Sequence, residues 1–386
     1  MPLVTAVARK RQLGVRFKAS DVAIKKLLAL ADVRVDGDRP WDIQVNDPRL
    51  YARVLTRGSL GLGEAYMDGW WDCEALDQFF HKVLEAKLED KVTPLAAVRL
   101  ALQARFTNMQ SRSRAFKVGE HHYDLGNYLF EQMLDERMTY SCGYWKDASN
   151  LDEAQEAKLE LICQKLYLRP GMRVLDIGCG WGSLAQYAAG KYGAHVVGIT
   201  VSKEQVPLAR ERCKGLPVEI RLQDYRDLSE LFDRVVSVGM FEHVGYRNYE
   251  VYMKVVGRCL KPEGLFLLHT IGCGNPRNFT DPWLNRYIFP NGMLPSTKQI
   301  AVATDCRFTL EDWHNFGTHY DNTLMAWHRN FTQNWERIGE RYDERFSRMW
   351  TYFLLSCAGS FRARWNHVWQ IVFSKSGSTH AYASIR

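Results

Sequence analysis

Three glycines follow a short apolar run near the middle of the chain. Residues 174–177 are apolar apart from Asp176, which is the pattern of a strand buried on both faces. Gly178, Gly180 and Gly182 follow at G-x-G-x-G spacing, and the next residues have helical periodicity. A strand that breaks into glycines before a helix brings bare backbone N–H groups up to a ligand. In a dinucleotide site the third glycine comes one residue later. A purely structural turn is the alternative.

Four polar residues stand where they could act on such a ligand. Glu242 follows one predicted strand, His269 closes the next, Cys142 precedes the sheet and Tyr320 precedes a late helix. Carboxyl, imidazole, thiol and phenol groups can each hold or move a proton. Each one alone is better explained as a packed or hydrogen-bonded core residue. Together, beside the carboxyl ends of neighbouring strands, they point to one crevice.

An alternating series of strands and helices must position these groups. Strands are predicted at residues 173–177, 195–200, 218–222, 234–238 and 265–269. Helices are predicted at 151–166, 183–192, 203–214 and 249–260. Such alternation indicates a parallel sheet covered by helices on both faces. Ligands of such sheets bind beyond the carboxyl ends of the strands.

The alternation stops after the fifth strand. Residues 273–295 are predicted to be rich in loops, and strands are predicted at 308–315 and 368–374, which brings the sheet to seven. Two long amphipathic helices are predicted between them, at 322–339 and 345–364. Their aromatic and methionine-rich faces form either the wall of an apolar tunnel or ordinary core.

The chain is predicted to have two domains. Residues 1–20 are interpreted as a basic tail, 21–105 as a small and mainly helical domain, 106–120 as a basic linker, and 121–386 as the larger α/β domain. A chain of 386 residues is long enough for two separate cores.

Two segments of the first part have open interpretations. The glycine- and aromatic-rich residues 58–71 form either a packed turn or a docking surface. At 98–117, basic residues alternate with apolar ones. This pattern suits either a helix lying on an anionic membrane surface or a solvated charged helix face.

Composition limits the class of protein. No apolar run approaches the roughly 18 residues that cross a bilayer, and the N-terminus lacks the apolar core of a secretory signal. The nine cysteines are scattered without a C-x-x-C pair, which argues against a disulfide framework and a zinc site and favours the cytosol. The net charge of +7 favours an anionic partner, but no nucleic-acid module is recognisable.

Longer motifs give the chain a family likeness. They are GSLGLGEAYMDGWW at 58–71, HYDLGN at 122–127, YSCGYW at 140–145, VLDIGCGWG at 174–182, QDYRD at 223–227, SVGMFEHVG at 237–245, LLHTIG at 267–272, DPWLNRYIFPNG at 281–292 and DWHNFGTHYD at 312–321. On this combination the chain, from about residue 30 to its end, resembles the cyclopropane-fatty-acyl-phospholipid synthases, which depend on S-adenosylmethionine (SAM). The resemblance implies a Rossmann-like class I SAM methyltransferase domain.

The resemblance also implies which residues bind SAM. They are Tyr140, Ser141, Asp176, Gly178, Cys179, Gly180, Trp181, Gly182, Thr200, Ser202, Gln205, Gln223, Asp224 and Tyr225. The acid that usually follows the second strand of a SAM methyltransferase is absent, as it normally is in this family. Hydroxyl groups and Gln205 are expected to replace it. Asp224 and Tyr225 are expected to hold the adenine by hydrogen bonding and stacking.

The family also binds a bicarbonate ion, on residues that correspond to Cys142, Glu242, His269, Ile271 and Tyr320. Ile271 and Cys142 are expected to contribute mainly through backbone groups. Attack of a cis double bond on the SAM methyl group gives a carbocation, which must lose a proton to close the ring. Bicarbonate is the expected base, in an apolar cavity that excludes water.

Cys357 is a rival catalytic candidate, because a cysteine at this position in the family has been taken for a nucleophile. It stands mid-helix among apolar neighbours, where a thiol is not easily ionised. A packed helix residue is therefore the favoured interpretation.

The expected activity is transfer of the SAM methyl carbon to the cis double bond of unsaturated acyl chains in membrane phospholipids, which forms a cyclopropane ring. The alternatives are a SAM methyltransferase with a methyl-branched, hydroxylated or N-methyl product, and a non-catalytic lipid-surface protein. The likeness also implies a cytoplasmic homodimer that associates peripherally with the inner membrane leaflet. No nucleic-acid partner and no metal are expected.

Overall fold

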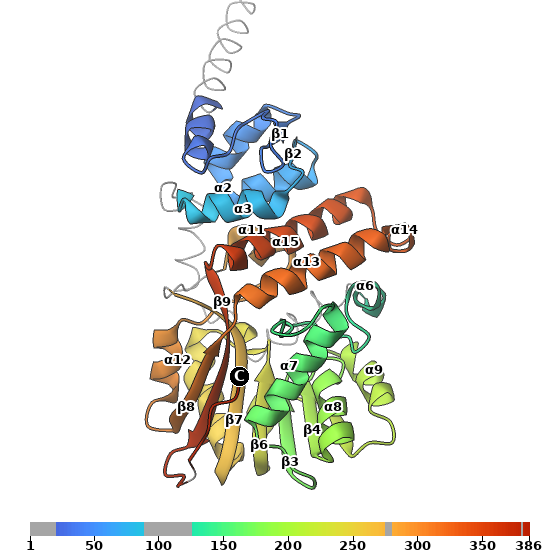
Figure 1. The fold of residues 1–386 in the computed structure, drawn as a ribbon, viewed down its shortest axis with the longest axis vertical. Coiled ribbons are helices and arrows are strands. Elements are labelled where there is room, and N and C mark those ends of the chain that lie inside the picture. The colour runs from blue at the N-terminus through green and yellow to red at the C-terminus, as the bar shows by residue number, and fades with distance from the viewer. Residues whose placement is uncertain (1–20, 89–125, 275–279, 380) are drawn as a thin grey trace, which may run out of the picture. The chain divides into compact units, whose positions relative to one another are not determined.

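The computed structural model describes residues 21–88, 126–274, 280–379 and 381–386 (Figure 1). The predicted basic tail and basic linker, the alternating basic stretch at 98–117 and most of the HYDLGN motif lie outside the described residues.

Packing divides the chain into two units that alternate along the sequence. The helical unit comprises Met1–Phe106, Asp281–Ile288 and Gly339–Trp365, and the sheet unit comprises Thr107–Thr280, Phe289–Ile338 and Asn366–Arg386. The sequence predicted one continuous domain over residues 121–386, whereas packing assigns two segments of that range to the helical unit. Two later segments join the first part of the chain because their side chains are buried there.

The sheet unit contains one seven-stranded sheet. Its strands are β3 (Arg173–Ile177), β4 (His195–Thr200), β5 (Val218–Leu222), β6 (Phe232–Val238), β7 (Leu260–Cys273), β8 (Phe308–Asn315) and β9 (Asn366–Lys375). The order is β5-β4-β3-β6-β7-β9-β8. The first five strands in this order are parallel, and β9 pairs antiparallel with both β7 and β8. The predicted α/β fold with a mainly parallel seven-stranded sheet is confirmed.

Helices cover both faces of this sheet, with α7 (Leu151–Lys165), α8 (Ser183–Tyr192) and α9 (Gln205–Arg212) on one face and α10 (Tyr249–Cys259) and α12 (Thr297–Thr304) on the other. The other described helices of this unit are α6 (Asn127–Met133), α13 (Thr318–Gln333) and α14 (Trp335–Ile338). Short 3₁₀ turns are η2 (Tyr225–Asp227), η3 (Phe241–His243) and η4 (Tyr246–Asn248). Helix α12 lies directly after the segment predicted as loops, and its start is fixed by a capping box between Ser296 and Gln299.

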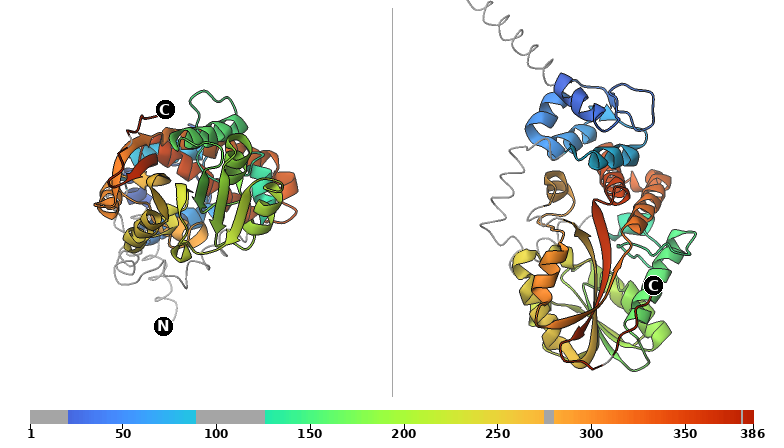
Figure 2. Two further views of the ribbon diagram at one scale, coloured as in Figure 1. Left: turned by 90° about the horizontal axis from the view of Figure 1, so that it is seen from below. Right: turned by 60° about the vertical axis from the view of Figure 1, so that its left-hand side comes forward.

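Alternation along the strands divides the core of the sheet unit into two clusters. Val174 packs with α7, α8 and α9, whereas Leu175 and Ile177 pack in the cluster that contains α10 and α12. The right-hand view of Figure 2 shows the two helix layers on opposite sides of the sheet. Because successive side chains of a strand point to opposite faces, a strand covered on both sides is apolar along its whole length.

The helical unit is built from four named helices and a small sheet. The helices are α2 (Arg49–Met67), α3 (Leu76–Glu85), α11 (Pro282–Tyr287) and α15 (Glu344–Arg362), and the antiparallel strands are β1 (Gln44–Val45) and β2 (Trp71–Asp72). A further helix begins the described chain at residues 21–29. The packed turn predicted within 58–71 is wrong, because most of this segment is helical. Within α2, which ends at Met67, only Gly58 departs from helical geometry, at φ 56° and ψ −135°.

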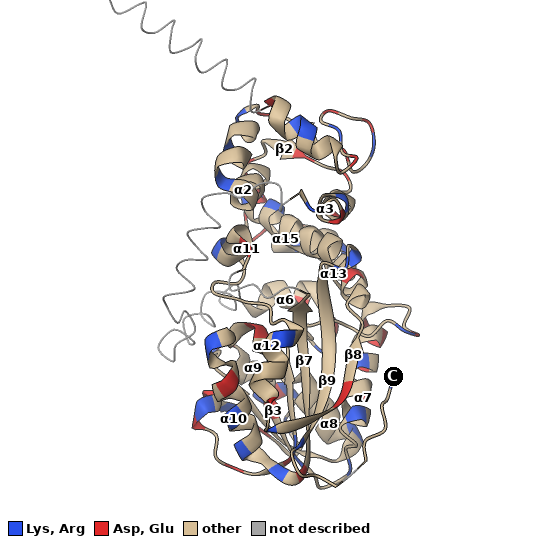
Figure 3. Cartoon of the chain, turned by 90° about the vertical axis from the view of Figure 1, so that its left-hand side faces the viewer, with Lys and Arg blue, Asp and Glu red and all other residues tan. Residues whose placement is uncertain are grey.

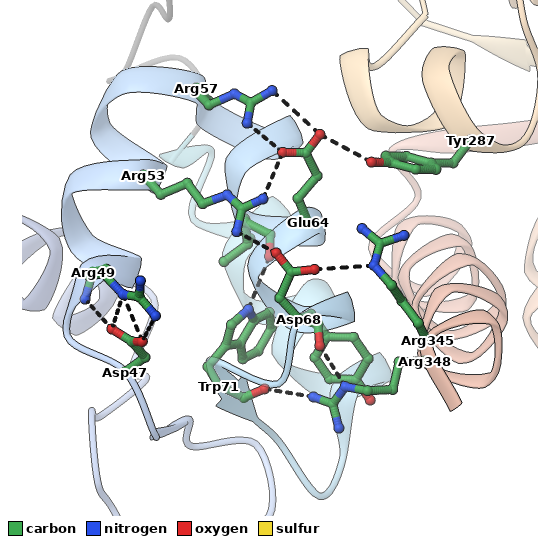
Figure 4. A network of polar contacts seen from close by, with 12 residues as sticks. Asp47, Arg49, Arg53, Arg57, Glu64, Asp68, Trp71, Tyr287, Arg345 and Arg348 are labelled. Carbon is green, nitrogen blue, oxygen red and sulfur yellow. Dashed lines mark hydrogen bonds and ion pairs between the residues drawn. The ribbon is translucent and has the colours of Figure 1, made fainter. Parts of the chain in front are cut away.

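A buried polar network joins the parts of the helical unit (Figure 4). Glu64 of α2 accepts hydrogen bonds from Arg53 at 2.9 Å and from the Tyr287 hydroxyl at 3.1 Å. Asp68 pairs with Arg53 at 2.7 Å and with Arg345 at 3.2 Å. These contacts link α2 to α11 and α15. They explain physically why two segments far along the chain belong to this unit.

Positive and negative side chains are interspersed over the outer helices of the sheet unit (Figure 3). Among the described residues, no helix combines the length and the apolarity that crossing a membrane requires.

Candidate active site

The glycine loop stands at the carboxyl end of β3. Gly178, Gly180 and Gly182 all have positive φ values, of 88°, 55° and 83°. Other residues adopt this region only with strain. A Cβ atom at position 178 would also lie 2.7 Å from the Cβ of Met240. Glycine at 178 is therefore required both by the backbone and by the neighbouring chain.

Backbone hydrogen bonds hold the loop beside β4. The N–H groups of Gly178 and Cys179 donate to the carbonyl of Ile199 at 2.9 and 3.0 Å. Helix α8 begins at Ser183, directly after the loop. The first N–H groups of a helix have no partner within it, so they favour an electronegative group placed at its N-terminus.

A pocket opens over this loop at the carboxyl ends of β3, β4 and β6. It is lined by Tyr140, Ser141, Asp176, Gly178, Cys179, Gly180, Trp181, Thr200, Ser202, Gln205, Gln223, Asp224 and Tyr225. Gly182 is the remaining predicted SAM residue, and it lies between two lining residues, Trp181 and Ser183. The structure therefore brings the predicted SAM residues together around one cavity.

Hydroxyl and amide groups replace the missing acid after β4. The Thr200 hydroxyl donates to Gln205 Oε1 at 2.8 Å, and the Ser202 N–H donates to the Thr200 Oγ1 at 3.1 Å. The carbonyl of Thr200 accepts from the N–H of Gln223 at 3.0 Å. Since Gln205 Oε1 is an acceptor in this arrangement, its amide N–H₂ is the group that can donate to a ligand hydroxyl.

The turn after β5 is more tightly bonded than the sequence suggests. The Asp224 carboxylate accepts from the Arg226 backbone N–H at 2.9 Å and pairs with the Arg226 guanidinium at 3.1 Å. The Tyr225 ring packs on Tyr252 with centroids 5.2 Å apart, and the Arg226 guanidinium lies 5.0 Å from the centroid of the Tyr225 ring. Contact of Asp224 and Tyr225 with adenine stays a prediction.

Asp176 fits a positively charged ligand. Its side chain is 2% exposed, and burial raises the pKa of its carboxyl to about 7. The Oδ2 atom accepts no hydrogen bond from any described residue. A buried oxygen without a donor is costly. The ammonium or sulfonium group of SAM would supply the missing partner.

Aromatic rings from four segments lie beside this pocket. Tyr140 stacks on Trp327 of α13 with centroids 5.1 Å apart, and Phe130 of α6 packs edge-on against Tyr140 at 5.0 Å. Trp181 lies 5.0 Å from Phe130. Tyr320 meets Trp327 edge-on at 5.8 Å. These rings exclude water from one side of the ligand site.

Glu242 and Ile271 are in direct contact. The Ile271 N–H donates to Glu242 Oε1 at 2.6 Å, and Glu242 Oε2 has no partner among the described residues. The side chain is 6% exposed, and burial raises the pKa of the carboxyl to about 7. The Ile271 N–H is thus used to hold Glu242. Ile271 positions the carboxyl and does not offer this N–H to an ion.

His269 lies on the same strand, two residues before Ile271. The Gln370 Nε2 lies 3.4 Å from the His269 Nδ1. With the amide donating, the ring proton is on Nε2. Burial, and then the charges of Lys158 and Lys165, lower the pKa of His269 well below its usual value. The imidazole is therefore neutral near neutral pH.

The segment that carries Cys142 contacts helix α13, on which Tyr320 lies. The wholly buried Cys142 precedes Gly143, whose N–H donates to the Thr323 Oγ1 at 3.0 Å. Thr323 and Tyr320 lie on α13, which begins at Thr318. The prediction that Tyr320 precedes the helix is wrong, since it lies in the first turn. Burial raises the pKa of the Cys142 thiol, so it stays protonated.

The five residues predicted to hold bicarbonate do not line the glycine-loop pocket, but some are its immediate neighbours in sequence. Cys142 follows Ser141, and Glu242 precedes His243, where both Ser141 and His243 line the pocket. Cys357 lies on α15, in the helical unit, and does not line this pocket. Burial raises the pKa of its thiol to about 12.

Sequence reasoning missed three ionisable residues of the pocket. Lys158 of α7, Arg226 of η2 and His243 of η3 all line it. Burial lowers the pKa of Lys158 to about 8 and that of His243 to about 4. The spacing of Lys158 from Ala154 and Ile162 places it on the apolar face of the helix, which was the available signal. For His243 the only signal in the sequence was its position next to Glu242.

Comparison with known proteins agrees with this geometry. The sequence profile of a family described as mycolic acid cyclopropane synthetase matches residues 110–371. The cyclopropane-fatty-acyl-phospholipid synthase of Escherichia coli K12 is 58% identical over 351 residues, which are 91% of this chain and 92% of that protein. The tuberculostearic acid methyltransferase UfaA1 of Mycobacterium tuberculosis is 34% identical over 357 residues, covering 86% of this chain and 83% of that protein.

A solved structure has the same fold. The mycolic acid cyclopropane synthase CmaA1, complexed with SAH and CTAB, superimposes with a TM-score of 0.64 at 32% identity. The match covers 68% of this chain and 98% of that one.

Proposed function

The chain belongs to the mycolic acid cyclopropane synthetase family of SAM-dependent methyltransferases, and we propose that it cyclopropanates unsaturated acyl chains of membrane phospholipids. The observation that carries this proposal is the glycine-loop pocket beside a set of buried, neutral proton donors. The likeness to a phospholipid-modifying relative extends over 91% of the chain, and therefore includes both units.

In this proposal the pocket residues bind and orient the cofactor. When bound, SAM supplies an electrophilic methyl group and bicarbonate supplies a weak base. Asp176 would meet the positive charge of the cofactor with its unpartnered oxygen. Gln205 would donate toward the ribose, and the glycine loop would allow close approach of backbone N–H groups. The rings around Tyr140 would keep water from the sulfonium.

The neighbouring residues hold the anion that receives the proton. With a pKa of about 7, Glu242 is about half protonated at neutral pH and mostly protonated below it, and in that form it can donate a hydrogen bond to an anion. Neutral His269 donates from Nε2, and Tyr320 donates from its hydroxyl. Each of these groups would supply one donor to a small anion with several acceptor oxygens. Ile271 fixes the carboxyl in place through its backbone N–H.

Membrane association, a homodimeric state and a location at the inner leaflet are also part of the proposal. The phospholipid-modifying relative and the net charge of +7, which favours anionic surfaces, support the membrane association. Sedimentation with vesicles that contain anionic lipid, at low and high salt, tests the first point. Light scattering of the purified chain tests the second.

The proposed activity is tested by incubating the full chain with SAM and phospholipid vesicles. Vesicles of cis-monounsaturated lipid should yield acyl chains that are heavier by one CH₂ and lack an olefinic NMR signal. Vesicles of saturated lipid should yield no product and serve as the control. A methyl-branched or hydroxylated product would instead favour the alternative methyltransferase activities. Unchanged acyl chains, with SAM bound, would contradict the proposal.

A further inference from the structure

Lys158 carries a buried charge that the protein itself hardly compensates. Its side chain lies on α7, is 1% exposed and lines the glycine-loop pocket. Its ammonium donates one hydrogen bond, to the Ser141 Oγ at 3.0 Å. No described carboxylate forms an ion pair with it. An ammonium has three N–H donors, so two remain for a ligand.

The neighbouring carboxylates do not take up these donors. Asp135 accepts hydrogen bonds from its own turn, including the Thr139 N–H at 2.7 Å and the Arg137 N–H at 3.1 Å. Asp176 keeps an Oδ2 without a partner among the described residues. The pocket therefore contains one buried cation and one buried acid that are not paired with each other. Burying an isolated charge is costly. Burial lowers the pKa of Lys158 and raises the pKa of Asp176, and both shifts favour the neutral form of the group.

A second buried lysine on the same helix shows the contrast. Lys165 is also fully buried, but its Nζ lies 3.5 Å from the Asp312 carboxylate and 3.1 Å from the His314 Nδ1. It does not line the pocket. The chain thus supplies partners to a buried lysine where no ligand approaches. At Lys158 it leaves donors unused.

We propose that Lys158 binds the α-carboxylate of SAM and makes the pocket selective for cofactors that carry this carboxylate. The amino-acid end of SAM is a zwitterion, so its carboxylate and ammonium are complementary to Lys158 and Asp176. Ser141 orients the lysine through its hydroxyl. The inference rests on the proposed SAM-dependent function and names the residue that recognises one end of the cofactor.

The test compares binding of SAM and of decarboxylated SAM to the full chain by isothermal titration calorimetry. The wild type should bind SAM about 10- to 100-fold more tightly, which is the range of a charge-assisted hydrogen bond. In Lys158→Met, SAM affinity should fall by about the same factor, while affinity for decarboxylated SAM changes by less than about threefold. Lys165→Met, the matched control, should keep the wild-type preference.

The outcomes separate this inference from its premise. If Lys158→Met weakens both ligands equally, or keeps the preference for SAM, the lysine is only structural and the inference is overturned. A wild type that binds both ligands equally also overturns it, even if the variant does not fold. Failure of the wild type to bind either ligand would instead count against the proposed function.

Discussion

Replacing Glu242 with glutamine tests whether its carboxyl is protonated in the folded protein. Burial raises the pKa of this group from 4.5 to about 7, against the opposing effect of the Ile271 N–H. At about 1.4 kcal/mol per pKa unit, the difference corresponds to about 3 kcal/mol. Because the folded-state pKa lies above that of the unfolded chain, this contribution to the free energy of unfolding is complete below pH 4.5 and is lost as the pH rises through about 7.

Glutamine cannot ionise, so Glu242→Gln lacks this pH dependence. The stability of the wild type relative to the variant should therefore fall by about 2–3 kcal/mol between about pH 5 and pH 8.5. Urea unfolding followed by circular dichroism at both pH values measures it. Glu131→Gln, at an exposed glutamate of α6, should show no such change. A constant difference between wild type and Glu242→Gln would refute the reasoning, because the carboxyl would then be ionised in the folded state.

Three other substitutions test separate parts of the site. Gly178→Ala should weaken SAH binding at least tenfold and destabilise the protein by about 1–3 kcal/mol, because the backbone has a positive φ and the new Cβ would clash with Met240. Calorimetry and unfolding measure these effects, and Gly190→Ala, in open space on α8, is the control for both. Tyr320→Phe should slow product formation by about 10²-fold while SAH affinity is unchanged, since Tyr320 does not line the pocket. Cys357→Ala should keep its turnover number within about threefold in the vesicle assay, because burial keeps the thiol protonated. Loss of turnover there would restore Cys357 as a catalytic candidate.

The sheet could be predicted closely because both of its faces are covered. The central strands between the two helix layers are mostly apolar, and β3, β4, β5 and β8 have the predicted bounds. Strand β7 is longer than predicted, because it begins at Leu260. This residue pairs with Phe232, and a register shift separates that pair from the rest of the ladder, which starts at Arg234 and Leu265. Helix α2 was missed because its glycines suggest a turn. Gly63 in fact allows the close approach of Trp283, whose ring would lie 2.4 Å from a Cβ there.

The site could be predicted only as far as its motifs reach. The motifs locate the residues that line the pocket, because glycine spacing and strand ends fix where backbone groups meet a ligand. They do not show Lys158, since a lysine on an amphipathic helix is usually solvated and only packing shows that it is buried. Nor do they show that the Ile271 N–H is used by Glu242. That contact depends on how η3 meets β7 in three dimensions.

The proposed chemistry needs a weak base and the absence of strong nucleophiles, and one physical cause supplies both. Burial is the largest cause of the raised pKa values of Glu242 and Cys142 and of the lowered pKa of His269. A thiolate beside a sulfonium would be methylated, whereas a buried thiol is not nucleophilic. A proton on carbon next to a cation is strongly acidic, so a weakly basic anion held by these donors can accept it. The same exclusion of water protects the cation and keeps the protein's own groups neutral.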